Sequence, residues 1–172
     1  YRPDEPVMTA ASYAAAILPA VRRSGLDLVL EPGRWIVGPA GLLLIRVVDF
    51  KAQPPGDRFF VVVDGGMTDL IRPALYGAWH GIEPVTPRKG RPILADIVGP
   101  VCETTDTLGT GRSIPPVEVS DLVAIRDAGA YGSVMASNYN KRPTAAEVMV
   151  EDGQSRLIRR RQTIDEMLQW DL

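Results

Sequence analysis

The stretch Gly-Pro-Val-Cys-Glu-Thr-Thr-Asp, residues 99–106, contains Cys102, the only cysteine of the chain. It follows an apolar run at 92–98, which predicts a strand that ends where the stretch begins. Glu103 and Asp106 flank the thiol, and carboxylates are costly to bury, so the segment is expected to be exposed or paired. A strand that ends in a Cys- and Glu-bearing loop is typical of a scaffold that presents reactive side chains from its loops.

Three further polar segments occupy the same kind of position, each beside an apolar segment and each rich in Gly, Pro, Arg or Tyr. They are Glu31-Pro32-Gly33-Arg34, Arg72-Pro73-Ala74-Leu75-Tyr76 and Asp127-Ala128-Gly129-Ala130-Tyr131-Gly132.

Composition limits the class of protein. The 172 residues are 45% hydrophobic and 23% charged, as in globular domains, and the net charge of −2 gives no electrostatic case for nucleic acid or an anionic membrane. No apolar run approaches the roughly 20 residues needed to span a bilayer. A single cysteine suits a reducing cytoplasm. The start at Tyr1, with charged residues and prolines but no signal peptide, is expected to be a cut inside a longer protein.

Residues 1–34 resemble the end of an α/β barrel. Thr9 can cap a helix over 10–23, which Pro19 should kink or split, and Gly25 can end it. The apolar run 26–30 then predicts a buried strand with polar residues at its carboxyl end. This helix–strand pattern occurs once, so the chain is expected to hold only the tail of such a barrel.

Residues 35–172 are expected to form a separate β-domain. Strands are predicted over 42–51, 59–63, 92–98, 121–126, 134–136, 147–150 and 156–160, with a short helical turn over 69–76. Asp152-Gly153 predicts a hairpin turn, and Thr163 with Glu166 predicts a capping box for a final helix, 164–170. The fold class is therefore mainly β with some α: an antiparallel barrel or sandwich with a short terminal helix.

Each candidate site residue has a structural alternative. Cys102 could donate a proton to a carbanion, or be a small buried hydrophobe. Gly33-Arg34 could hold a phosphate or a carboxylate, or be an ordinary turn with a solvated Arg. Arg72 and Tyr76 could recognise an anionic group, or pack as an Arg stem over a core Tyr. Tyr131 has room for a ligand beside it, or belongs to a β-bulge. His80, the only histidine, is interpreted as structural, and no His-based metal site is expected.

Together, five segments resemble the diaminopimelate decarboxylase family, of the alanine-racemase-like fold type of pyridoxal-phosphate enzymes. They are, in order, 31–34, Asp64-Gly65-Gly66, 72–76, 99–106 and 127–132. Thr104-Thr105 replaces the serines common in the family motif but keeps the hydroxyl groups.

The resemblance implies a pyridoxal 5′-phosphate-dependent decarboxylase that acts on meso-diaminopimelate, with residues 1–34 from its barrel and 35–172 as its C-terminal β-domain. It implies a cytoplasmic homodimer whose active site lies at the subunit interface, with Cys102 as proton donor and Glu103 near the substrate's distal ammonium. It implies cofactor contacts from Glu31, Gly33, Arg34 and Tyr131, and substrate contacts from Arg34, Arg72, Tyr76, Glu103 and Tyr131.

One feature of the family is missing from the chain. The lysine that carries the cofactor lies early in the family's barrel, whereas Lys51, Lys89 and Lys141 are the only lysines here. The chain is therefore expected to be inactive alone and to need the N-terminal barrel as a partner. Decarboxylases of ornithine, arginine or carboxynorspermidine, and a non-catalytic regulatory β-domain, remain the alternative interpretations.

Overall fold

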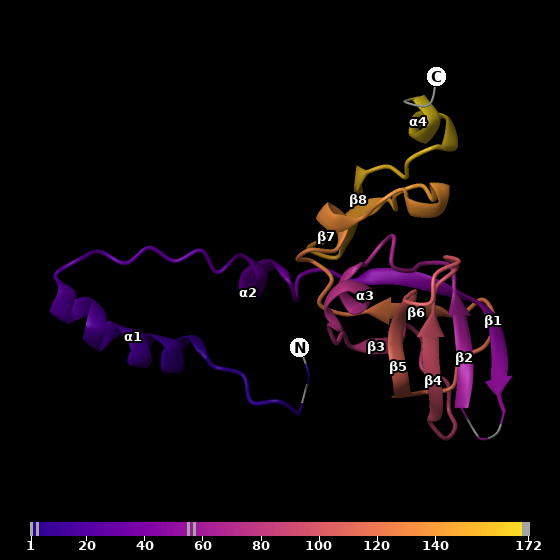
Figure 1. Ribbon diagram of the computed structural model, residues 1–172, viewed down its shortest axis with the longest axis horizontal. Helices are drawn as coiled ribbons and strands as arrows, with labels where there is room; N and C mark the ends of the chain where they lie inside the picture. The colour runs from indigo at the N-terminus through magenta and orange to yellow at the C-terminus, as the bar shows by residue number, and fades with distance from the viewer. Residues whose placement is uncertain (1, 3, 55, 57, 170–172) are drawn as a thin grey trace.

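The computed structural model describes residues 2, 4–54, 56 and 58–169 of the chain. Among these residues, six strands form one sheet in the order β3-β6-β1-β2-β4-β5, curled into a nearly closed barrel (Figure 1). The first and last strands meet at Gly109, where an added Cβ would come within 2.7 Å of Ile82 Cδ1. The strands are β1 Leu43–Gln53, β2 Arg58–Val63, β3 Ile82–Pro84, β4 Ile93–Val98, β5 Thr107–Ile114 and β6 Leu122–Ile125. The predicted β-barrel class is confirmed.

One strand pair departs from the antiparallel expectation, because β2 and β4 run parallel, with Val61 opposite Ile97. The other pairs in this sheet are antiparallel. Since β6 is antiparallel to β1 and β1 is antiparallel to β2, the carboxyl ends of β2, β4 and β6 lie at the same end of the barrel. The loops after these three strands therefore gather at that end.

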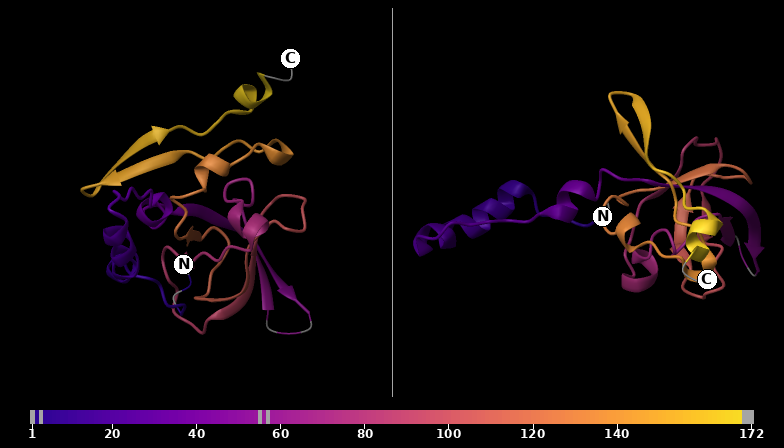
Figure 2. Two further views of the ribbon diagram at one scale, coloured as in Figure 1. Left: turned by 60° about the vertical axis from the view of Figure 1, so that its left-hand side comes forward. Right: turned by 90° about the horizontal axis from the view of Figure 1, so that it is seen from above.

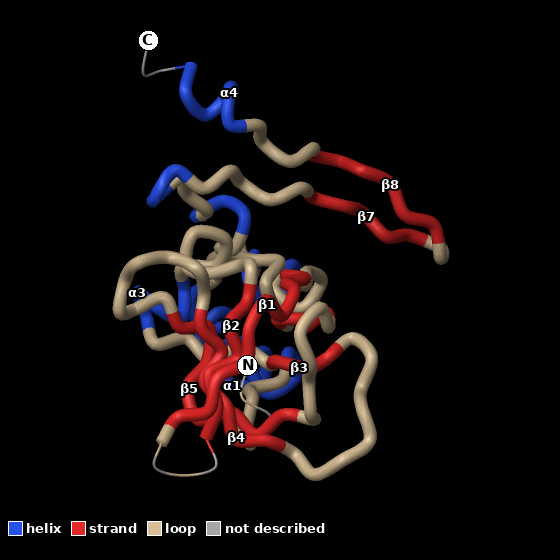
Figure 3. Tube along the Cα trace, turned by 90° about the vertical axis from the view of Figure 1, so that its right-hand side faces the viewer, coloured by secondary structure: helices blue, strands red, loops and turns tan. Residues whose placement is uncertain are grey.

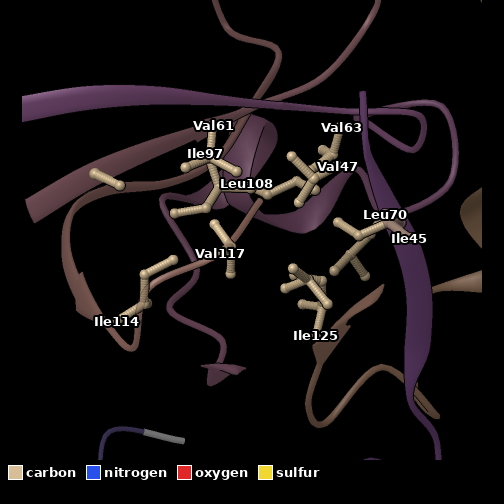
Figure 4. Close-up of a cluster of buried hydrophobic side chains, with 12 residues drawn as sticks. Ile45, Val47, Val61, Val63, Leu70, Ile97, Leu108, Ile114, Val117 and Ile125 are labelled. Atoms are coloured by element: carbon tan, nitrogen blue, oxygen red, sulfur yellow. The ribbon is translucent and has the colours of Figure 1, made fainter. Parts of the chain in front are cut away.

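Alternation of side chains along the strands builds the core. In β1, Ile45 and Val47 are buried and Leu44 and Arg46 are exposed, as the period of two requires. Figure 4 shows the inward-facing side chains converging inside the barrel. The buried cluster consists of Ile45, Val47, Val61, Val63, Leu70, Ala95, Ile97, Leu108, Ile114, Val117, Val123 and Ile125.

The N-terminal helix and the run that follows it lie away from the barrel (Figures 1 and 2). Helix α1, Ala10–Ser24, is capped as predicted, by the Thr9 side chain and by Gly25 at φ 68°. Pro19 does not split it, and no residue of α1 is buried. The predicted strand at 26–30 is wrong: this run is extended and exposed, because a barrel strand needs neighbouring strands and none of the described strands lies beside it.

Two short helices lie beside the barrel. Helix α2, Gly33–Val37, replaces the turn expected at Gly33-Arg34. Helix α3, Arg72–Tyr76, confirms the predicted helical turn, and Pro73 lies in its first turn, where a missing N–H costs nothing.

A hairpin and a final helix stand apart from the barrel, as Figure 3 shows. Strands β7, Glu147–Glu151, and β8, Gln154–Arg159, are joined by Asp152 and Gly153, both with positive φ, so the predicted hairpin turn is confirmed. Helix α4, Ile164–Leu168, has the predicted capping box. The strand predicted at 134–136 is wrong, because this segment forms a 3₁₀ turn, Ser133–Met135.

Candidate functional site

Four loop segments meet at one end of the barrel. Two follow the parallel strands β2 and β4, a third follows β6, and α2 enters β1 from the same end. These are the segments that carry the sequence motifs: 64–76, 99–106, 127–132 and 31–37. The parallel pairing thus gives a physical reason for motifs far apart in the sequence to lie together.

Backbone contacts tie α2 to the tyrosine turn, residues 128–132. The amide of Ala128 donates to the Gly41 carbonyl at 2.9 Å, and the amide of Gly129 donates to the Gly38 carbonyl at 3.0 Å. A Cβ at Gly129 would lie 1.9 Å from the Val37 carbonyl oxygen, so only glycine permits this approach. Arg34, one turn earlier in α2, is thereby held near the tyrosine turn.

Tyr131 projects from this turn with a left-handed backbone, φ 58°, and its side chain is 49% exposed. The turn contains no strand, so the β-bulge alternative is wrong. The Arg72 guanidinium carbon lies 6.0 Å from the centre of the Tyr131 ring, at the outer limit of a cation–π contact. The motif segments 64–76 and 127–132 therefore lie in contact through Arg72 and Tyr131.

Arg34 and Arg72 line one hollow of about 200 Å³, together with Ala78 and Trp79 and with Arg2 and Glu5 of the N-terminal segment. Arg72 is 7% exposed although it carries a charge. Arg2 pairs with Glu5 at 3.5 Å. The guanidinium groups of Arg34 and Arg72, with a phenol beside them, form a donor set that suits carboxylate or phosphate.

Asp106 fixes the cysteine loop, residues 99–106. Its carboxylate is 4% exposed and accepts hydrogen bonds from the amides of Met67, at 2.6 Å, and Val101, at 2.7 Å. A Cβ at Gly66 or Gly99 would lie 2.5 Å or less from a carboxylate oxygen, so the two glycines make the space for it. Burial raises the pKa of Asp106, and the two amide donors oppose that rise. The loop is thereby joined to the segment that leads into α3.

Cys102 and Glu103 project outward from this loop. Both are exposed, so the interpretation of Cys102 as a small buried hydrophobe is wrong. Its neighbour Val101 fills the apolar position instead. Tyr76, at the end of α3, is 63% exposed. These three side chains do not line the hollow of Arg34 and Arg72, although their segments adjoin it. Glu31 and Gly33 are exposed at the start of α2.

His80 contacts Arg72, and this contact was not predicted from the sequence. It is fully buried, its Nδ1 lies 2.9 Å from the Arg126 carbonyl oxygen, and its Nε2 lies 3.4 Å from Nη1 of Arg72. Burial lowers the pKa of His80, and the charge of Arg72 adds to that effect. The sequence feature that could have indicated this contact is that His80, the single histidine of the chain, lies eight residues after Arg72.

A second hollow, of about 390 Å³, opens between β3 and β5 and is less suited to a free anion. One of its cations, Arg126, is paired with Glu83 at 2.8 Å. The other, Arg112, lies over the Trp79 ring at 4.2 Å and donates to the His80 carbonyl, and burial lowers its pKa.

None of the three lysines lines either hollow, and Lys51 pairs with Asp49 at 3.2 Å. Within the described residues, no cluster of three or more His, Cys, Asp or Glu side chains could hold a metal ion. In the same part of the chain, no helix has the length and apolar character to cross a membrane.

Comparisons with known proteins identify the same family that the sequence motifs resemble. A model of the family described as "Pyridoxal-dependent decarboxylase, C-terminal sheet domain" matches residues 13–129. Diaminopimelate decarboxylase of Neisseria meningitidis serogroup A is 50% identical over 165 residues, which cover 96% of this chain and 40% of that enzyme. Two solved structures of diaminopimelate decarboxylases with L-lysine are also similar. That from Helicobacter pylori has a TM-score of 0.87 and 40% identity over 98% of this chain and 41% of its own. That from M. jannaschii has a TM-score of 0.93 and 36% identity, and the match covers 100% of this chain and 40% of its own. The chain spans about two fifths of the length of these relatives.

Proposed function

Because the chain belongs to the pyridoxal-dependent decarboxylases, as their C-terminal sheet domain, we propose that it forms part of a decarboxylase that converts meso-diaminopimelate to L-lysine and CO₂. The observation that carries this proposal is the meeting of the motif loops at one barrel end, where Arg34, Arg72 and Tyr131 form an anion-binding set. The proposal places the enzyme in the cytoplasm, where the single cysteine stays reduced.

The residues present fit one end of pyridoxal 5′-phosphate. Arg34 supplies a guanidinium and the tyrosine turn beside α2 supplies the phenol of Tyr131, which together suit a phosphate dianion. Glu31 and Gly33 complete the proposed cofactor contacts. When bound, the cofactor supplies an electron sink for the bond between Cα and the carboxylate. The lysine that attaches it would come from the N-terminal barrel.

Arginine and tyrosine side chains orient the substrate in this proposal. The substrate carboxylates are bound by Arg34, Arg72, Tyr76 and Tyr131. Because binding already fixes the orientation of the scissile bond, less entropy is lost on reaching the transition state, and the barrier is lower. The exposed Glu103 carboxylate matches the distal ammonium of a substrate with two amino-acid ends.

Cys102 supplies the proton that completes the reaction. The Cα–carboxylate bond breaks, CO₂ leaves, and the electron pair that remains at Cα takes the thiol proton; water then restores the thiol. We place Cys102 and Glu103 of one subunit in the active site of the other subunit of a homodimer. Their exposure on a loop held by Asp106 supports this placement.

The exposed N-terminal segment supports the barrel as partner. Apolar side chains in 26–37 are open to solvent, among them Val29 at 83% and Trp35 at 64%. Many exposed apolar side chains in one segment indicate an interaction site. We propose that the N-terminal barrel of the enzyme covers it.

The test compares the complete enzyme with the chain alone. Carbon dioxide release should be found with meso-diaminopimelate for the complete enzyme, or for the chain mixed with its N-terminal part, and not for residues 1–172 alone. Faster turnover of ornithine, arginine or carboxynorspermidine would reassign the substrate. Inhibition of an otherwise active N-terminal part by the chain would identify a regulatory domain instead.

Replacing Arg72 with Ala should raise KM for meso-diaminopimelate about 10-fold and change kcat less, because the guanidinium binds the substrate in the ground state and in the transition state alike. Steady-state kinetics of the complete enzyme measure both constants. Arg88→Ala is the matched control, since Arg88 pairs with Asp121 at 2.8 Å outside the motif loops. An Arg72→Ala enzyme with an unchanged KM would remove Arg72 from the substrate site.

A further inference from the structure

His80 connects α3 with the end of β6 through a side chain that no solvent reaches, and its backbone carbonyl adds a contact with β5. Its imidazole lies between Arg72 of α3 and the backbone of Arg126 at the end of β6, and its own carbonyl accepts from Arg112 of β5. A buried histidine with two directed contacts is constrained in its proton position as well as in its ring position.

The two contacts require one tautomer. A carbonyl oxygen only accepts, so Nδ1, 2.9 Å from the Arg126 oxygen, must carry the proton. A guanidinium only donates, so Nε2, 3.4 Å from Arg72 Nη1, must present its lone pair. The neutral imidazole protonated on Nδ1 satisfies both contacts. The imidazolium would instead direct an N–H at the guanidinium and place two positive charges together.

We propose that neutral His80 is a positioning residue that orients the Arg72 guanidinium for the substrate carboxylate, an inference that rests on the role of Arg72 in the proposed function. Arg72 has to turn donors toward the hollow that it shares with Arg34. Nε2 of His80 is a fixed acceptor that restricts the orientation of the Arg72 guanidinium. Substrate binding then has less side-chain conformational entropy to remove.

The charges around the ring give the pH dependence. The Arg126 carbonyl and Asp127 favour the imidazolium, Arg72 disfavours it, and Arg112 contacts the backbone rather than the ring. Burial is the largest influence and lowers the pKa of His80 below its ordinary value of 6.5. The contact is therefore complete at neutral pH and is lost as the pH falls through the lowered pKa. In the unfolded chain the histidine takes a proton at a higher pH, so the contribution of His80 to folding stability decreases as the pH falls below about 6.5.

Nitrogen NMR tests the geometry without any assay of activity. His80 is the only histidine of the chain, so histidine-selective ¹⁵N labelling of the chain gives one imidazole. Near neutral pH we expect a protonated, pyrrole-type Nδ1 and an unprotonated, pyridine-type Nε2, with a titration midpoint below 6.5. Arg72→Met should shift the Nε2 resonance and leave Nδ1 protonated. A proton on Nε2, or a midpoint at or above 6.5, would overturn the inference.

Kinetics of the complete enzyme test the positioning role. His80→Leu removes the acceptor and should raise KM about 10-fold with a smaller change in kcat. His80→Gln keeps a donor and an acceptor on one planar group without a titratable nitrogen. It should restore KM to within about threefold of the parent. We expect KM of the parent enzyme to rise in acid as His80 takes a proton, and His80→Gln should abolish that rise.

The outcomes separate the inference from the proposed function. A parent enzyme without turnover on meso-diaminopimelate would refute the proposed function, while the NMR signals would still accept or reject the His80–Arg72 contact. The correct NMR pattern with a parental KM in folded His80→Leu enzyme would refute the positioning role. Near-ultraviolet circular dichroism establishes that each variant is folded.

Discussion

Replacing Cys102 with Ala is expected to lower kcat of the complete enzyme by about 100-fold or more, with little change in KM. A general acid contributes roughly 10²- to 10⁴-fold, and it acts mainly in the transition state. Cys102 is exposed on a loop that Asp106 anchors from beneath, so the alanine should leave the loop in place. Steady-state kinetics with meso-diaminopimelate measure both constants.

The control for this variant is Thr104→Ala in the same exposed loop, which removes a hydroxyl two residues away. It should keep kcat within about threefold of the parent. Equal losses in both variants would indicate a disturbed loop rather than a missing proton donor, and a fully active Cys102→Ala enzyme would contradict the assignment.

Replacing Asp106 with Ala should decrease the free energy of unfolding by roughly 3 kcal/mol, since it leaves the buried amide of Val101 and the half-buried amide of Met67 without their charged acceptor. The cysteine loop would also lose its connection to the segment before α3, so kcat should fall as well. Urea denaturation of the chain measures the first effect, and kinetics of the complete enzyme measure the second.

Asp106→Asn refines this prediction, because the amide keeps the shape but offers only one oxygen, so an intermediate loss is expected. Asp27→Ala, an exposed acid between α1 and α2, should change stability by no more than about 0.5 kcal/mol. If Asp106→Ala were as stable as Asp27→Ala, the carboxylate would not hold the loop.

Strand positions were predictable where one face is buried. The length and the branched residues of 42–51 predicted a strand there, and β1 is Leu43–Gln53, with Ile45 and Val47 on its buried face. Strand β5 was missed because Gly109 and Gly111 resemble loop residues, yet Gly109 is where Ile82 of β3 closes the barrel. Strand β3, with three residues, is too short to show any period.

Long-range partners were not predictable from local patterns. The run 26–30 has the composition of a buried strand, but its burial depends on neighbours that the described residues do not include. The parallel pairing of β2 with β4 likewise depends on the whole chain, because neither strand differs in composition from an antiparallel one.

The candidate site was identified by its residue types, and its internal support was not. Glu103 and Asp106 are both carboxylates three residues apart, yet one is exposed and the other is buried against two amides. Arg72 was selected as an anion-binding group, and its burial beside His80 was not predicted. Such differences arise from tertiary packing, which no local sequence pattern records.

The pairing of β1 with β6 also sets when the barrel can form. Leu43 lies opposite Ile125, so about 80 residues separate partners that hydrogen-bond side by side. Contacts of such long sequence separation give a high contact order and slow folding, because loop-closure entropy is lost before the contacts form. During synthesis the first strand has to wait until β6 has left the ribosome. Until then its apolar face is open to chaperones and to aggregation.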